Sequence, residues 1–299
     1  IIASKLGIDP ADLRLKNLCK EGTSFITTQT LEGVHIQQTM EAALEASGYR
    51  EKKGKMGPNR GIGIANSMLN TGFLASSAAV RINEDGTASV LTGIVDIGTG
   101  THTVLCQIAA EVFGIPVNRI GIAAPDSDSS PYDTGSISSR TTTDAGNAVR
   151  LACEDARAQL IEIAAASFKC KPEEVAYANG WMTCKTNPNL KRSYTDVLGE
   201  SMFMRHGPII GRGSFIAREP FEHEVFEGYS ERPVGMFTFG TQIAEVEVDP
   251  TTGKTKVLNF TAAHDIGTIV NPIGLEGQVE GGVVQGMGYG LYEELIVYT

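Results

Sequence analysis

The feature that most constrains the fold is a tetrapeptide, Asp-Ile-Gly-Thr, that occurs twice, at residues 96–99 and 265–268. Each copy follows a segment with the alternating pattern and turn residues of a β-hairpin, at residues 78–95 and 241–263. Each copy also precedes a segment with helical character. Four shared residues alone could arise by chance. The same hairpin before each copy favours two similar half-domains that face each other.

A glycine-rich hinge contains the first copy and is the first candidate ligand-binding segment. A helix is predicted from Thr101 to Gly114, where glycine ends it. The hinge is neither a dinucleotide fingerprint nor a P-loop, because it lacks the third glycine and a following Gly-Lys-Ser/Thr. Alone it indicates only a strand-to-helix turn, and without further evidence His102 is interpreted as a structural histidine. The hinge residues that we take as candidates are Gly98, Thr99, Gly100, Thr101, His102 and Thr103.

A hydroxyl-rich loop at residues 127–144 is the second candidate segment, and a helix is predicted to begin near Asp144, whose carboxylate can cap it. Helix N-termini bind anions, because their N–H groups are unsatisfied and the helix dipole is positive there. We therefore expect one phosphate-bearing ligand to lie across both helix N-termini, with Arg140 adding a cation. A solvated loop with spare helix caps remains open as the alternative. The candidate hydroxyls are Ser138, Ser139, Thr141, Thr142 and Thr143.

The last predicted helix follows Asn271-Pro272 and is unusually rich in glycine. Three of its glycines fall four residues apart on one face, and each interior glycine costs a helix about 1 kcal/mol relative to alanine. Another backbone or a flat ligand could therefore approach this face closely. Gln278 is either an ordinary polar residue of this helix or a partner for an oxygen or amide group of a ligand. The three glycines are Gly282, Gly286 and Gly290.

Composition limits the classes of protein that this chain can represent. With 299 residues, 41% hydrophobic and 20% charged, the chain can build one large domain or two ordinary ones. The net charge of −10 and the lack of a basic cluster argue against a nucleic-acid partner. No apolar run has the length of a membrane span. Five cysteines without metal-binding spacing favour a reduced, cytoplasmic protein.

The connecting segments are less informative. Residues 171–198 have the pattern of strands and turns, with Trp181 expected in the core. Residues 207–234 form a long irregular stretch, and a loop of this length usually has a function or covers something. Residues 52–59 are a basic segment with glycine and proline that we expect to be a domain boundary. Both ends of the chain fall inside predicted elements, so we expect part of a longer polypeptide.

Five stretches together resemble the molybdenum-binding large subunit of the xanthine oxidase family, the molybdenum hydroxylases. They follow the family's order and span nearly the whole chain. The most specific are the hinge with its threonine and histidine, and the helix motif Gln278-Val279-Glu280-Gly281. The stretches are residues 7–17, 96–103, 133–149, 244–253 and 271–286.

The resemblance implies an α+β fold made of two similar mixed α/β lobes of the molybdenum-cofactor-binding domain, with the duplicated hairpin-strand-helix unit. Residues 1–58 would be the end of the first molybdenum-binding domain and a linker. Residues 59–299 would be the second molybdenum-binding domain, incomplete at its C-terminus, with lobes at about 59–170 and 171–299.

The resemblance also implies an activity of the xanthine dehydrogenase or aldehyde oxidase type. Such an enzyme hydroxylates an N-heterocycle, for example a purine, or an aldehyde, and takes the oxygen from water. It uses molybdenum held by molybdopterin, in bacterial members usually as the cytosine dinucleotide. Electrons would pass to iron–sulfur and FAD parts on other subunits or segments. The alternative is a non-catalytic scaffold or fragment of the same fold without bound cofactor.

Matched by position, the hinge from Gly98 to Thr103 would hold the pterin and phosphates together with Ser138, Ser139 and Thr141. Gln278 would lie beside the molybdenum without ligating it. Thr99 departs from the family, which usually has glutamine there, so a pterin contact is lost or bridged by water. The general-base glutamate of the family's Gly-Glu-Pro stretch is expected beyond residue 299, so this chain alone is expected to be inactive.

Overall fold

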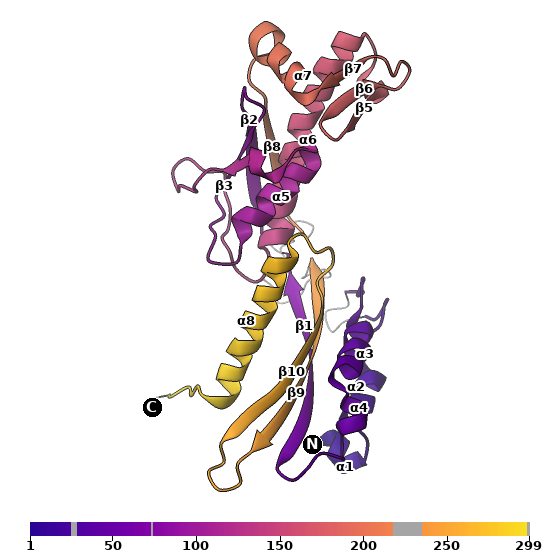
Figure 1. Cartoon of the computed structure of the whole chain (residues 1–299), viewed down its shortest axis with the longest axis vertical. Coiled ribbons are helices and arrows are strands. Elements are labelled where there is room, and N and C mark those ends of the chain that lie inside the picture. Colours follow the sequence, from indigo (N-terminus) through magenta and orange to yellow (C-terminus); the bar gives the residue numbers. More distant parts are fainter. Residues whose placement is uncertain (25–28, 73, 218–234, 298–299) are drawn as a thin grey trace. The chain divides into compact units, whose positions relative to one another are not determined.

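The computed structural model describes residues 1–24, 29–72, 74–217 and 235–297, as helices and sheets in an α+β arrangement (Figure 1). The chain forms two compact units. One comprises Ile1–Asn70 and Pro220–Thr299, and we call it the outer unit because it is built from the two outer parts of the sequence. The other comprises Thr71–Glu219, and we call it the inner unit. The domain borders drawn from the sequence stay a prediction.

The outer unit is a three-stranded sheet with short helices from the start of the chain. Its strand order is β1-β9-β10, so residues almost two hundred positions apart pair side by side. Helix α3 packs on β9 and β10 and buries Met40, Ala43 and Leu44. The elements are α1 (Ile2–Leu6), α2 (Pro10–Asn17), α3 (Ile36–Ser47), α4 (Tyr49–Lys52), β1 (Arg60–Thr71), β9 (Met236–Val248), β10 (Thr255–Asp265) and α8 (Pro272–Leu291).

The inner unit contains the larger hydrophobic core, between a four-stranded sheet of order β4-β3-β2-β8 and helices α5 and α6. Helix α6 lies directly against the backbone of β8. A Cβ added at Gly211 would be only 2.0 Å from the Ala152 carbonyl oxygen. Only glycine permits so close an approach. The elements are β2 (Ser76–Ile82), β3 (Ala88–Thr92), α5 (Thr101–Phe113), η1 (Val117–Arg119), β4 (Ile120–Ile122), α6 (Thr141–Phe168) and β8 (Ile210–Phe215).

A small sheet of order β5-β6-β7 completes the inner unit and packs on the C-terminal ends of α5 and α6 (Figure 1). The Tyr177 hydroxyl on β5 donates to the carbonyl oxygen of Phe113, the last residue of α5, at 2.7 Å. The elements here are η2 (Pro172–Glu174), β5 (Val175–Ala178), β6 (Trp181–Cys184), β7 (Lys191–Ser193), α7 (Tyr194–Glu200) and the π-helical turn η3 (Ser201–Arg205).

The duplicated unit predicted from the sequence is confirmed. The antiparallel strands β2 and β3 lead through Asp96 into α5, and the antiparallel strands β9 and β10 lead through Asp265 into α8. In both copies the aspartate side chain accepts the N–H of the glycine two residues on, at 2.9 Å for Gly98 and 3.2 Å for Gly267. The shared tetrapeptide therefore encodes the same local turn twice.

Three details of the sequence interpretation were wrong. Helix α6 begins at Thr141, so Asp144 lies inside its first turn and does not cap it. Trp181 is 45% exposed with the Lys191 ammonium 4.5 Å from its ring centre, because its strand lies in a sheet too small to cover it. Residues 210–215 of the expected irregular stretch form β8, whereas residues 218–234 lie outside the described part. Among the helices described, none has the length and apolar character that crossing a membrane requires.

Candidate functional site

Asp96 shapes the hinge at the N-terminus of α5. Its carboxylate accepts the backbone N–H groups of Gly98 at 2.9 Å, Gly100 at 3.2 Å and His102 at 3.3 Å. Burial is the largest single effect on Asp96 and opposes ionisation, but the three N–H donors together lower the pKa of Asp96 below its usual value. The hinge amides predicted to be open for an anion are therefore partly occupied by a carboxylate of the chain itself.

The hinge backbone is open on its outer side. Gly98 has a φ of 99° and Gly100 a φ of 75°, and a Cβ added at either would meet nothing within 4 Å. The Thr99 and Thr101 hydroxyls hydrogen-bond each other at 2.8 Å. The Nε2 atom of His102 is buried and has no hydrogen-bond partner among the described residues. Open backbone beside a buried polar atom without a partner offers a ligand both space and a hydrogen bond.

The hydroxyl-rich loop lies next to the hinge. The Ser136 hydroxyl donates to the Val95 carbonyl oxygen, one residue before Asp96, at 2.7 Å. The Thr71 hydroxyl holds the loop from the other side by donating to the Ser139 carbonyl oxygen at 2.8 Å. The structure therefore brings the two segments that carry the candidate residues together within the inner unit.

Ser138 and Ser139 stand in strained positions at the tip of this loop. Their φ angles are 46° and 56°, in the left-handed region that few residues other than glycine adopt. Both residues are exposed, and Thr141 begins α6 two positions later. The N-cap of α6, Arg140, gives its first turn no side-chain hydrogen bond. An anion bound at the start of this 28-residue helix stays a prediction.

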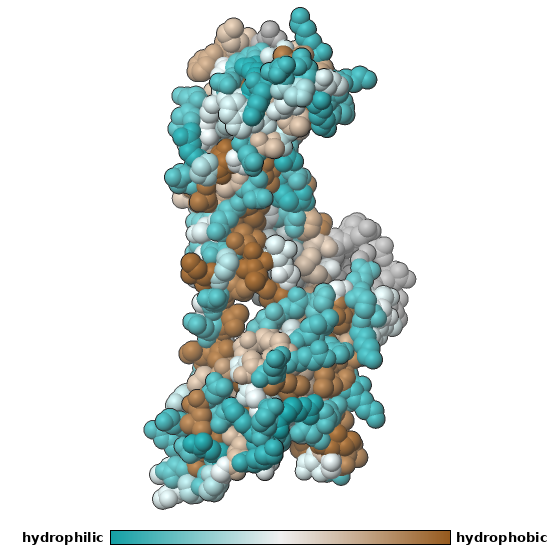
Figure 2. Space-filling view, turned by 45° about the vertical axis from the view of Figure 1, so that its right-hand side comes forward, coloured by the Kyte–Doolittle hydropathy of each residue, from teal (hydrophilic) through white to brown (hydrophobic). Residues whose placement is uncertain are grey.

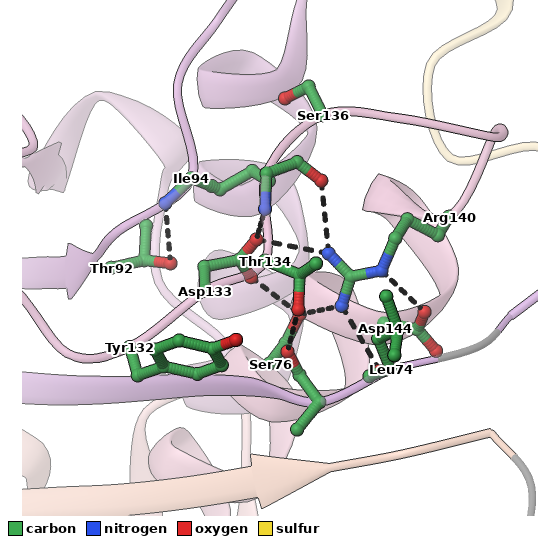
Figure 3. Close-up of polar contacts among 12 residues, drawn as sticks. Leu74, Ser76, Thr92, Ile94, Tyr132, Asp133, Thr134, Ser136, Arg140 and Asp144 are labelled. Atoms are coloured by element: carbon green, nitrogen blue, oxygen red, sulfur yellow. Dashed lines mark hydrogen bonds and ion pairs between the residues drawn. The ribbon is translucent and has the colours of Figure 1, made fainter.

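Arg140 is not a ligand-binding cation, and this part of the sequence interpretation was wrong. Its side chain is completely buried, and it donates through Nε to Asp144 at 3.0 Å and through Nη1 to Asp133 at 3.0 Å (Figure 3). Further bonds run from Nη1 to the Gly135 carbonyl oxygen at 3.1 Å, and from Nη2 to the Ser76 hydroxyl at 2.7 Å and the Leu74 carbonyl oxygen at 3.3 Å. The guanidinium thus fastens the hydroxyl-rich loop to the start of β2.

Asp133 is the residue that sequence reasoning missed. Its side chain is fully buried beside Arg140, and it also accepts the Ser76 hydroxyl at 2.5 Å and the Gly135 N–H at 2.7 Å. The available signal was the pair of acidic residues seven positions before and four positions after Arg140. An i,i+4 pair of opposite charge at a helix start is a recognisable pattern, although only tertiary contact buries it.

Apolar side chains are exposed beside the hinge and the loop. Ile97 is 64% exposed, and Val95 and Ile137 are also exposed. Figure 2 shows that brown apolar residues lie exposed among teal hydrophilic residues on one face of the molecule. Exposed apolar side chains next to hydroxyls suit a ligand that has both a flat ring system and phosphates.

Gln278 lies on α8 in the outer unit, and its side chain is exposed. The glycine-rich face of α8 is open, since a Cβ added at Gly282, Gly286 or Gly290 would meet nothing within 4 Å. The position of Gln278 beside a molybdenum atom stays a prediction. Within the described residues, no group of three or more His, Cys, Asp or Glu side chains could hold a metal ion.

Comparison with known proteins decides the family. Residues 38–299 match the family described as the molybdopterin cofactor-binding domain. The chain belongs to this family. It is 29% identical over 98% of its length to the nicotine 6-hydroxylase large subunit of Paenarthrobacter nicotinovorans. It is 27% identical over 99% of its length to a putative xanthine dehydrogenase molybdenum-binding subunit of Escherichia coli. The predicted resemblance to the molybdenum-binding large subunits of the xanthine oxidase family is confirmed.

Solved structures agree with the fold. Quinoline 2-oxidoreductase from Pseudomonas putida 86 superposes with a TM-score of 0.84 over 99% of this chain at 24% identity, a level that supports the fold alone. The aldehyde oxidoreductase of Desulfovibrio gigas has a TM-score of 0.74 over 96% of this chain at 26% identity. The chain spans 38% of the length of the nicotine 6-hydroxylase subunit and 39% of the xanthine dehydrogenase subunit.

Proposed function

We propose that this chain holds the molybdenum–molybdopterin cofactor, as the cytosine dinucleotide, within a molybdenum hydroxylase. The observation that carries the proposal is the junction of the hinge with the hydroxyl-rich loop, made by the Ser136–Val95 hydrogen bond beside the open glycine backbone. Relatives named as nicotine 6-hydroxylase and xanthine dehydrogenase subunits support a reaction on an N-heterocycle or an aldehyde, with water as the oxygen source.

Each group of residues has a separate task in this proposal. The Gly98–Gly100 backbone accommodates the pterin ring, Ile97 gives it an apolar contact, and His102 Nε2 gives it a hydrogen bond. The Ser138, Ser139 and Thr141 hydroxyls, with the N-terminus of α6, bind the phosphates.

The family resemblance also gives a role to two further residues. Gln278 orients groups near the molybdenum through its amide. Thr99 is too short to reach as far as the glutamine usual in the family, so water bridges that contact. When bound, the molybdenum centre supplies two-electron redox chemistry.

The remaining parts of the enzyme lie outside this chain. The general base is a glutamate expected beyond residue 299, and iron–sulfur and FAD subunits or domains accept the electrons. The complex is cytoplasmic, which the five free cysteines favour. The second candidate is a non-catalytic scaffold of the same fold, and Thr99 in place of glutamine is the feature that favours it.

Cofactor content of the natively purified complex tests the proposal. Elemental mass spectrometry gives molybdenum per chain, and acid hydrolysis followed by chromatography gives the released nucleotide. We expect near-stoichiometric molybdenum and an equal amount of cytidine monophosphate. The double variant Ser138→Ala/Ser139→Ala should lose most of both.

A matched control is Ser129→Ala. Among the described residues the hydroxyl of Ser129 donates to the nearby Asp126 carboxylate, so this variant should leave both contents unchanged. Absence of molybdenum from the wild-type complex would favour the scaffold. Full molybdenum content in the double variant would mean that the hydroxyl-rich loop is not part of the cofactor site.

A further inference from the structure

Helix α8 of the outer unit is apolar but uncovered. It has 20 residues, and none of them is buried within the part of the chain that the structure describes. Ile273 is 84% exposed, Val284 67% and Tyr289 71%. Seven residues of α8 are glycine, which disfavours a helix, and such a helix gains most of its stability from packing. The described residues do not supply that packing.

The sheet of the outer unit is also covered on one face only. Helix α3 lies on the first face, where Met40, Ile62 and Ile243 belong to a buried apolar cluster. Because side chains alternate along a strand, every second residue of β1, β9 and β10 lies on the opposite face, which we call the far face. The apolar residues of the far face are exposed or only half-buried. They are Ala65, Ala244, Val246, Val248, Val257, Phe260 and Ala262.

A cavity of about 700 Å³ lies between the end of α8 and the end of the β9–β10 hairpin. Met287 and Leu291 of α8 line it together with Val248 and Val257 of the far face. In Figure 1 the strands lie between α8 and α3, each of which contacts β10. An uncovered apolar helix and an uncovered apolar sheet face therefore border the same cavity.

The surface formed by α8 and the far face carries little charge. Glu276 and Glu280 are the only charged residues of α8, although the whole chain has a net charge of −10. The charged residues that line the cavity belong to the hairpin end and are Glu247, Asp249, Lys254 and Lys256. An apolar centre with charged residues at its edge is the composition of a permanent protein interface. This surface therefore fits an apolar polypeptide.

The lengths of the relatives point to the polypeptide that covers this surface. The nicotine 6-hydroxylase and xanthine dehydrogenase subunits match 98–99% of this chain, whereas this chain spans only 38–39% of their length. In each of these relatives, one subunit therefore contains the matching region and more than as much polypeptide again.

We propose that the remaining polypeptide of a molybdenum hydroxylase large subunit covers α8 and the far face, and fills the cavity with apolar side chains. The proposal rests on membership of the family and not on the proposed cofactor site.

Amide hydrogen exchange in the natively purified complex tests whether α8 is covered. Mass spectrometry follows the exchange of residues 272–291, and residues 36–47 of α3 are the matched reference, a helix that packs on the same sheet. We expect α8 to exchange at least about 100-fold more slowly than an unstructured peptide, as a packed element does. Exchange of α8 at nearly the rate of an unstructured peptide, with α3 protected, would overturn the proposal.

Photo-crosslinking tests which polypeptide covers α8. The photoreactive residue p-benzoylphenylalanine resembles tyrosine and bonds to C–H groups beside it, so Tyr289→p-benzoylphenylalanine probes the exposed side of α8. After irradiation of the complex, we expect peptides in which residue 289 is joined to large-subunit sequence outside residues 1–299. The control is Gln38→p-benzoylphenylalanine, on the exposed face of α3, which should give no such peptide.

The other products would overturn the proposal. They are cross-links from residue 289 to an iron–sulfur or FAD subunit, cross-links only to residues 1–299 of the same or a second copy, and no cross-link at all. Neither experiment measures molybdenum, so failure here leaves the proposed function untouched.

Discussion

Replacing Arg140 by methionine should destabilise the inner unit more than any surface change. The substitution removes at least the five hydrogen bonds described above and leaves Asp133 and Asp144 buried without their cation. Removing one partner of a buried ion pair costs about 3–5 kcal/mol. One guanidinium serves two carboxylates here, so we expect the upper end, about 5 kcal/mol. A protein of this size has only about 5–15 kcal/mol in total. The melting temperature should fall by about 10–20 °C.

Arg140→Lys separates charge from geometry. Lysine keeps the positive charge but has only three donors in place of a rigid planar fork, so it cannot make all five bonds. We expect a loss of about 2–3 kcal/mol. The matched control on the same helix is Arg150→Lys, because Arg150 is 41% exposed and pairs with Glu154 four residues on. An exposed pair of this kind contributes less than about 1 kcal/mol.

Urea unfolding followed by circular dichroism measures all three variants against wild type. The expected order of stability is wild type and Arg150→Lys, then Arg140→Lys, then Arg140→Met. If Arg140→Met unfolded at the same urea concentration as Arg150→Lys, the two buried aspartates would not depend on the guanidinium, and the reasoning would fail.

Further predictions concern packing, pH and thiol reactivity. Gly211→Ala should lower stability by about 1–3 kcal/mol in the same assay, because its Cβ would lie 2.0 Å from the Ala152 carbonyl oxygen. Gly63→Ala, with nothing within 4 Å, is its control, and equal losses would contradict the close approach. The pKa of Asp96 is lower in the folded protein than in the unfolded chain. At pH values above the usual aspartate pKa of about 4, ionised Asp96 therefore stabilises the folded state. This stabilisation is lost as the pH falls through the lowered pKa of the folded state. The stability difference between wild type and Asp96→Asn should therefore be present at pH 7 and shrink as the pH falls below the usual aspartate pKa, and a difference that did not depend on pH would count against it. Burial raises the pKa of Cys153 to about 12, so iodoacetamide at pH 8 should label this thiol only after unfolding, and rapid labelling of the native protein would refute its burial.

Local sequence determined much of the fold. The start of α5 at Thr101 and its end before Gly114 follow from helical periodicity and from glycine in the left-handed conformation at the C-cap. The repeated turn after β3 and β10 follows from aspartate two residues before glycine. These signals lie within a few residues of the structure they specify, so the sequence reveals them directly.

Tertiary structure alone decided what the polar side chains do. Arg140 and Ser138 lie two residues apart in one loop, yet the first is completely buried and the second is exposed. Asp96 takes up hinge amides that helix-end reasoning left open. Periodicity and turn chemistry act over one or two turns of chain, and they fix which elements form. Burial and hydrogen-bond partners depend on which distant segments pack together, and the same residue types serve as ligand donors or as internal ties according to that packing.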